Sequence, residues 1–85
     1  MASLPKILAS VLSGTADANM RFNDLRRLLD SLGFQHRVKG DHFIYVRTGV
    51  AAIINIQPLP GGKAKAYQVK QVRQIITQHG LQLGR

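Results

Sequence analysis

The hydrophobic pattern of this chain changes its period at Phe34, and that change restricts the fold more than any other feature. Before it, Leu25, Leu28, Leu29 and Leu32 recur at the three- and four-residue spacing of a helix face. From Phe34 onward, apolar and polar residues alternate, which is typical of a strand. The two patterns occupy separate blocks, so the chain predicts an α+β domain.

The helical blocks have recognisable ends. Residues 3–13 predict an N-terminal helix, because Ser3 can cap its start and Gly14 can stop it. A second helix is expected to begin with Asn23 as its N-cap and to end at Gly33. Its Arg26 and Arg27 lie off the apolar stripe and are expected in solvent.

A last helix is expected from Ala66 or Tyr67 to His79, where Gly80 can end it. The spacing predicts an inner face and an outer face for this helix. The inner face comprises Val69, Val72, Ile75, Ile76 and His79, and the outer face carries Lys70 and Arg73.

The alternating block predicts a three-stranded antiparallel meander. In the first strand Phe34, His36 and Val38 share one face, which predicts a half-buried strand with a basic outer face formed by Gln35, Arg37 and Lys39. A turn at residues 40–41 leads to a strand over about 42–47, and a further turn leads to a strand over 50–56. That third strand is nearly all apolar, so we expect it to be well covered.

At 85 residues the chain predicts one domain, 1–85, with the two longer helices packed on one face of the sheet and the N-terminal helix added. The apolar run at residues 7–12 is too short to cross a membrane, so no membrane partner is expected. The chain has no cysteine, which excludes disulfides and thiolate metal sites and allows a cytoplasmic location.

The charge is strongly unbalanced. Twelve Lys and Arg stand against four acids, giving a formal net charge of +8. A small domain this basic predicts a polyanionic partner, such as a nucleic acid or an acidic protein. The candidate phosphate-binding residues are Arg37, Lys39, Lys63, Lys65, Lys70 and Arg73.

His42 is the first candidate for proton transfer. It follows the turn glycine Gly40 and Asp41, so we expect two strands to hold it close to solvent. Histidine is the side chain whose ordinary pKa lies nearest neutrality, which suits a general base. Spacing alone leaves a second interpretation open, in which His42 is an exposed or structural histidine at a strand start.

The other candidates have simpler interpretations. His36 is expected at the edge of the core, and His79 in a last helical turn, where it complements the helix dipole. The histidines are dispersed and lack glutamate partners, so we expect no metal and no cofactor. Phe43 and Tyr45 share a strand face, where they either pack in the core or stack on unpaired bases.

Several blocks in order resemble the HicA family of bacterial toxins. The resemblance covers residues 22–81, and the helix at 3–13 is typical of one branch of the family rather than of its core. The blocks that carry it are 22–29, Leu32-Gly33-Phe34, 37–45 with Gly40-Asp41-His42, 55–60 and 63–73.

The resemblance implies a double-stranded-RNA-binding-domain-like fold and an mRNA-cleaving toxin that a HicB-family antitoxin neutralises. The family's catalytic histidine corresponds to His42 and its turn glycine to Gly40, while Asp41 stands where serine is common. Metal-independent RNA cleavage is therefore the expected activity. The alternatives are a non-catalytic RNA-binding module of the same fold and a protein-interaction domain matched to an acidic antitoxin.

Overall fold

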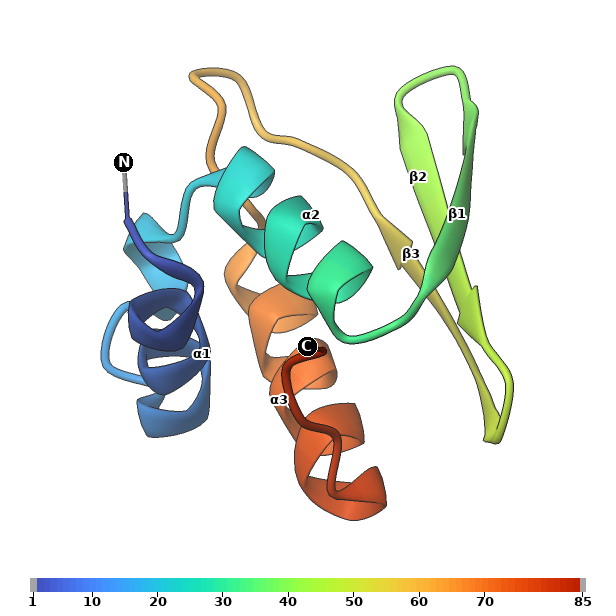
Figure 1. The fold of residues 1–85 in the computed structure, drawn as a ribbon. Helices are drawn as coiled ribbons and strands as arrows, with labels where there is room; N and C mark the ends of the chain where they lie inside the picture. Colours follow the sequence, from blue (N-terminus) through green and yellow to red (C-terminus); the bar gives the residue numbers. More distant parts are fainter. Residues whose placement is uncertain (1, 85) are drawn as a thin grey trace.

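The computed structural model describes residues 2–84 and confirms the expected order of helices and strands (Figure 1). The elements are α1 (Leu4–Ser13), the 3-10 helix η1 (Asp17–Asn19), α2 (Phe22–Ser31), β1 (Gln35–Lys39), β2 (His42–Arg47), β3 (Val50–Ile56) and α3 (Ala66–His79). The α+β class and the antiparallel meander are therefore both as predicted, with η1 as an addition.

The sheet has the order β1-β2-β3, with both neighbouring pairs antiparallel. In Figure 1, α2 and α3 lie between the sheet and α1, so α1 forms an outer layer beyond the other two helices. The order from α2 to α3 is helix–strand–strand–strand–helix, which is the double-stranded-RNA-binding-domain-like arrangement. Consequently one face of the sheet is covered by helices and the opposite face has no helix on it.

Residue pairing assigns each strand residue to a face, because directly paired residues point to the same side. Tyr45 pairs with Ile54, and Phe43 pairs with Ile56. Tyr45, Ile54 and Ile56 are completely buried, so they define the inner, helix-covered face. The outer face is formed by the alternate residues, which include Arg37, Lys39, His42, Ile44, Val46, Ile53 and Asn55.

The ends of α1 follow the prediction, but the start of α2 does not. The Ser3 hydroxyl accepts a bond from the Lys6 N–H at 3.4 Å, and Gly14 ends α1 with φ 74°. The N-cap of α2 is Arg21, so the expectation that Asn23 caps this helix is wrong. Tertiary pairing starts the helix earlier, because the Phe22 N–H donates to the Gly62 carbonyl at 2.9 Å.

The predicted half-burial of the first strand is wrong. Phe34 is buried just before the strand, yet every residue of β1 is exposed, and Val38 is 53% exposed. β1 is an edge strand, and the β1–β2 hairpin extends to one side of the helices in Figure 1. Its inner-facing residues therefore share a side with the core without being covered by it.

The expected covering of the third strand is also wrong. Ile54 and Ile56 are buried, but the neighbouring Ile53 is 62% exposed, and Asn55 is exposed as well. Because helices cover one face of the sheet only, an apolar run across both faces leaves half of its side chains in solvent.

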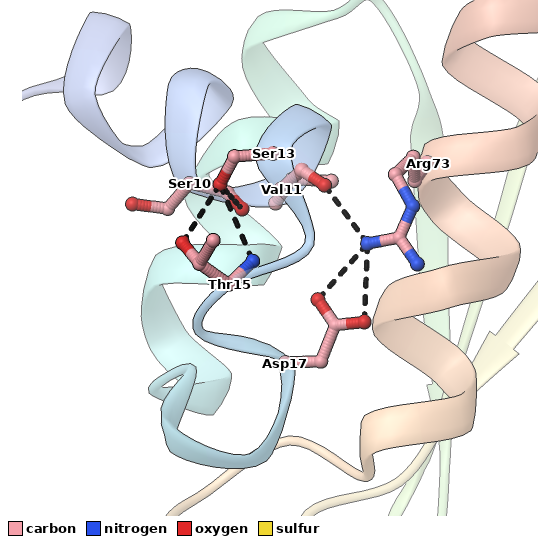
Figure 2. A network of polar contacts seen from close by, with 6 residues as sticks. All are labelled: Ser10, Val11, Ser13, Thr15, Asp17 and Arg73. Carbon is pink, nitrogen blue, oxygen red and sulfur yellow. Dashed lines mark hydrogen bonds and ion pairs between the residues drawn. The ribbon is translucent and has the colours of Figure 1, made fainter.

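Three arginines expected in solvent instead contact the protein, and one of them, Arg27, donates to the Ala2 carbonyl at 3.0 Å. Arg26 donates to the Tyr45 hydroxyl at 3.2 Å, and its guanidinium lies 4.3 Å from the centre of the Phe43 ring. Arg73 donates to both carboxylate oxygens of Asp17, at 3.0 and 3.1 Å, and to the Val11 carbonyl (Figure 2). Arg73 thus ties α3 to the end of α1 and to η1.

Residues of the C-terminal segment occupy the place in the core that was expected for His79. His79, placed on the inner face of the last helix by its spacing, is exposed. Leu81 and Leu83 pack against the core instead, and the Gly84 N–H donates to the Ser31 carbonyl at 2.9 Å. The chain after Gly80 therefore turns back toward the end of α2, and its leucines rather than His79 contact the core.

Candidate active site

His42 is the first residue of β2 and lies on the outer face, directly opposite Lys39. The two-residue loop before it has a left-handed Gly40, with φ 63°, followed by Asp41 at negative φ. This is the pattern of a type II′ hairpin turn, whose first position favours glycine. The hairpin therefore holds an exposed imidazole close to the end of two strands.

The hydrogen bond of the His42 ring selects its tautomer. Nδ1 lies 3.2 Å from Oδ1 of Asn55, a β3 residue on the same face. An amide oxygen only accepts hydrogen bonds, so Nδ1 carries the proton in the neutral ring and Nε2 keeps its lone pair. Nε2 lies 3.8 Å from Oδ1 of Asp41, so a carboxylate stands beside the nitrogen that keeps its lone pair. This geometry suits a general base.

Asp41 is held ionised. A hydrogen bond of 2.8 Å from the Gln57 side-chain amide lowers the pKa of the Asp41 carboxyl below its ordinary 3.8. Partial desolvation opposes this shift, while the Asp41 backbone N–H and the charges of His42 and Lys65 add to it. Asp41 is therefore a carboxylate across the neutral range.

Gln57 also connects this turn to the start of α3. Its Oε1 accepts from the Lys65 ammonium at 3.0 Å, so one side chain bridges Asp41 and Lys65. The Gln57 backbone N–H donates in turn to Oε1 of the buried Gln68 at 3.1 Å. As a result, a cation from the helix start is kept beside the histidine turn.

The sequence-predicted basic residues divide into groups. Arg37 and Lys39 are exposed on the outer face, paired with Ile44 and His42 respectively. They extend the positive surface from His42 along β1. Together with Lys65, they are the cations that the fold gathers around the histidine.

Three others lie apart from that group. Lys63 is exposed and donates to the Asn19 side chain at 3.3 Å, near the start of α2. Lys70 is exposed on α3. Arg73 is half-buried in its ion pair with Asp17, so it lies on neither the outer face nor the histidine turn.

Sequence reasoning missed Asn55, Gln57 and Gln68 as members of the site. The signal was present in part, because Asn55 and Gln57 are polar residues at alternate positions at the end of an apolar strand. Gln68 had no such signal, since it becomes a partner through the packing of α3 against β3.

The remaining candidates have other roles or none in this site. Phe43 and Tyr45 face the helices, so of the two interpretations the structure supports core packing. His36 lies on the opposite face of the sheet from His42, with its Nδ1 3.0 Å from Oδ1 of Asp30.

Among residues 2–84, no three histidine or acidic side chains gather closely enough to hold a metal ion. Within the same residues, no helix is both long and apolar enough to cross a membrane.

Comparison with known proteins supplies one match. Residues 22–81 match the family model described as HicA toxin of bacterial toxin-antitoxin. This match spans α2, the sheet, α3 and the histidine turn, and leaves α1 and η1 outside. Neither a search of curated proteins nor a search of solved structures finds a match.

Proposed function

The chain belongs to the HicA family of toxins from bacterial toxin–antitoxin pairs, and we propose that it is an endoribonuclease that cleaves mRNA with His42 as general base. Membership of this family implies an antitoxin partner. The observation that carries the proposed activity is the Nδ1 bond to Asn55, which leaves Nε2 of an exposed histidine free to accept a proton.

In the proposed reaction, Nε2 of His42 removes the proton of a ribose 2′-hydroxyl. The 2′-oxygen then forms a bond to the adjacent phosphorus, and the bond from that phosphorus to the 5′-oxygen of the next nucleotide breaks. The products are a 2′,3′-cyclic phosphate and a 5′-hydroxyl, whose proton comes from solvent. The base comes from the chain, the nucleophile from the RNA and the proton of the leaving group from solvent, so the proposed reaction needs no metal and no cofactor. DNA lacks the 2′-hydroxyl and is not a substrate.

The surrounding charges have distinct proposed roles. Asp41 stabilises the imidazolium that forms when Nε2 takes the proton. Lys65, held by Gln57, offsets the negative charge that develops on the phosphate. Arg37 and Lys39 bind the flanking phosphates, while Lys63 and Lys70 add further contacts to the backbone.

A cleavage assay in EDTA tests this proposal. Wild type and His42→Ala are incubated with end-labelled RNA and with DNA of the same sequence. We expect wild type to cut the RNA alone and His42→Ala to lose at least about 100-fold in rate while it stays folded. Equal cleavage by both proteins would remove His42 from the mechanism. RNA binding without cleavage by wild type would favour the non-catalytic RNA-binding module.

The proposed partner is a HicB-family antitoxin that covers the outer face. Ile44, Val46 and Ile53 form an apolar strip there beside the positive charges of Arg37 and Lys39. An acidic protein with an apolar contact surface would complement both. Because bacterial mRNA is cytoplasmic, the cytoplasm is the proposed site of action.

A further inference from the structure

Tyr67 differs from every other aromatic residue in its exposure. The chain has three phenylalanines, two tyrosines and no tryptophan. Phe22, Phe34 and Tyr45 are buried, and Phe43 is half-buried between the Phe22 ring and Arg26. The Tyr67 side chain is 66% exposed, so it is the aromatic surface that the fold offers to a ligand.

The surroundings of Tyr67 are positively charged. It is the second residue of α3, two residues after Lys65 and three before the exposed Lys70. The first turn of α3 contains no acidic residue, and the helix start adds its own partial positive charge. An aromatic ring between cations is the combination that binds single-stranded nucleic acid, because bases stack on the ring while the cations contact phosphates.

Hydrogen bonds link this ring to the histidine turn. The Gln68 amide donates to the Tyr67 hydroxyl at 3.4 Å, and Oε1 of Gln68 accepts from the Gln57 backbone at 3.1 Å. Gln57 in turn holds both Asp41 and Lys65. Tyr67 therefore belongs to the same polar network as the candidate active site rather than to a separate surface.

We propose that Tyr67 is a stacking subsite for an unpaired base next to the cleaved phosphate, with Lys70 contacting the flanking phosphate. This inference rests on the proposed RNA cleavage and specifies its substrate as single-stranded RNA. Bases in a duplex already stack on one another, so a duplex offers no free base to the ring. The polar neighbours of Tyr67 on α3 favour this ligand over an apolar protein contact.

Binding measurements on an inactive background test the subsite without relying on cleavage. In His42→Ala protein, Tyr67→Ala should weaken the binding of a short mixed-sequence single-stranded RNA by roughly 5- to 150-fold. Tyr67→Phe keeps the ring and should bind as the parent does. Binding of the corresponding RNA duplex should be the same in all three proteins. Lys70→Ala should reduce the salt dependence of single-strand binding by about one phosphate contact.

A spectroscopic signal identifies stacking directly. Tyr67→Trp introduces the single tryptophan of the chain, and single-stranded RNA should quench its fluorescence, whereas duplex RNA should not. Unchanged single-strand binding by Tyr67→Ala, or the absence of quenching, would overturn the subsite and leave Tyr67 as a surface for the antitoxin. Quenching without RNA cleavage by wild type would instead retain the subsite and reject the proposed nuclease.

Discussion

The two faces of the sheet are built from alternating residues of the same strands, yet they have opposite properties. The inner face buries Tyr45, Ile54 and Ile56 beneath the helices. The outer face carries His42, exposed apolar side chains and cations. The difference shows that the apolar side chains buried beneath the helices stabilise the fold from one face of the sheet. The other face is therefore free for binding and chemistry.

The same contrast separates two histidines that each have an aspartate nearby. His36, on the inner side of β1, has Nδ1 3.0 Å from the Asp30 carboxylate, and its ring lies 5.0 Å from that of Tyr45. His42, on the outer face, uses Nδ1 for its hydrogen bond to the neutral Asn55 amide, and its Nε2 stays accessible. A histidine joined to α2 and the core serves structure, whereas one that stands clear of the helices can serve as a base.

The largest expected effect comes from exchanging each histidine for glutamine. His42→Gln should lower the rate of RNA cleavage by about 100- to 10,000-fold, because the base is lost, with little change in the free energy of unfolding. His36→Gln should keep the cleavage rate and lose about 1 kcal/mol of stability with the Asp30 contact. Single-turnover cleavage and urea unfolding measure the two effects, and a loss of cleavage in His36→Gln would break the comparison.

Adjacent isoleucines of β3 test the two faces for stability. Ile54→Ala removes a completely buried side chain and should lower the free energy of unfolding by about 2–5 kcal/mol. Ile53→Ala lies on the exposed outer face and should change it by less than about 0.5 kcal/mol. Urea denaturation of both variants gives the difference, and equal destabilisation would show that the outer face is also covered.

A smaller effect is expected at Asn55, which positions the His42 ring. Asn55→Leu removes the acceptor for Nδ1 and should reduce the cleavage rate by about 2- to 12-fold, the value of one modest hydrogen bond. Asn55→Asp retains an acceptor at the same place and should recover most of the rate. If both variants cleaved RNA equally slowly, the hydrogen bond donated by Nδ1 of His42 would not explain the contribution of Asn55 to the cleavage rate.

The smallest expected effect is a pH dependence of stability at Asp41. The Gln57 bond lowers the pKa of Asp41 in the folded state below 3.8, so the folded state favours the carboxylate. This contribution is complete above pH 3.8 and is lost as the pH falls below it. The difference in unfolding free energy between wild type and Asp41→Asn should therefore disappear on acidification.

Gln57→Ala provides the control for that measurement. It removes the main cause of the shift, so adding Asp41→Asn in this background should change the acid dependence much less. If Asp41→Asn changed the acid dependence as much in the Gln57→Ala background as in wild type, the Gln57 bond would not be the cause of the shift.

Much of the fold was predictable because it depends on local pattern. The helix period, the alternation after Phe34 and glycines such as Gly14 located the elements to within a residue or two. The error at Asn23 had a non-local cause, since the loop before α3 pairs with the start of α2. The burial of β1 failed for a related reason, because alternation does not show over which strands of a sheet the helices pack: β3 is also an edge strand, yet it buries Ile54 and Ile56.

The site was predictable only in part. The Gly40–His42 turn is contiguous, so its residue types identified the histidine. Gln57, however, reaches it from the chain beyond β3, and Lys65 arrives from the start of α3. Arg73 shows the converse, because its place on a helix predicted solvent and the ion pair with Asp17 draws it inward.

By itself, the sequence determined the order of helices and strands, the net positive charge, the family and the histidine at the hairpin turn. Only the tertiary structure decided over which strands the helices pack and which distant side chains meet there. Alternation in a strand indicates which residues share a face, but it does not show which neighbours cover that face. That packing directs His36 toward Asp30 of α2, and it leaves His42 on the open face beside Asn55, with Gln57 linking its turn to Lys65.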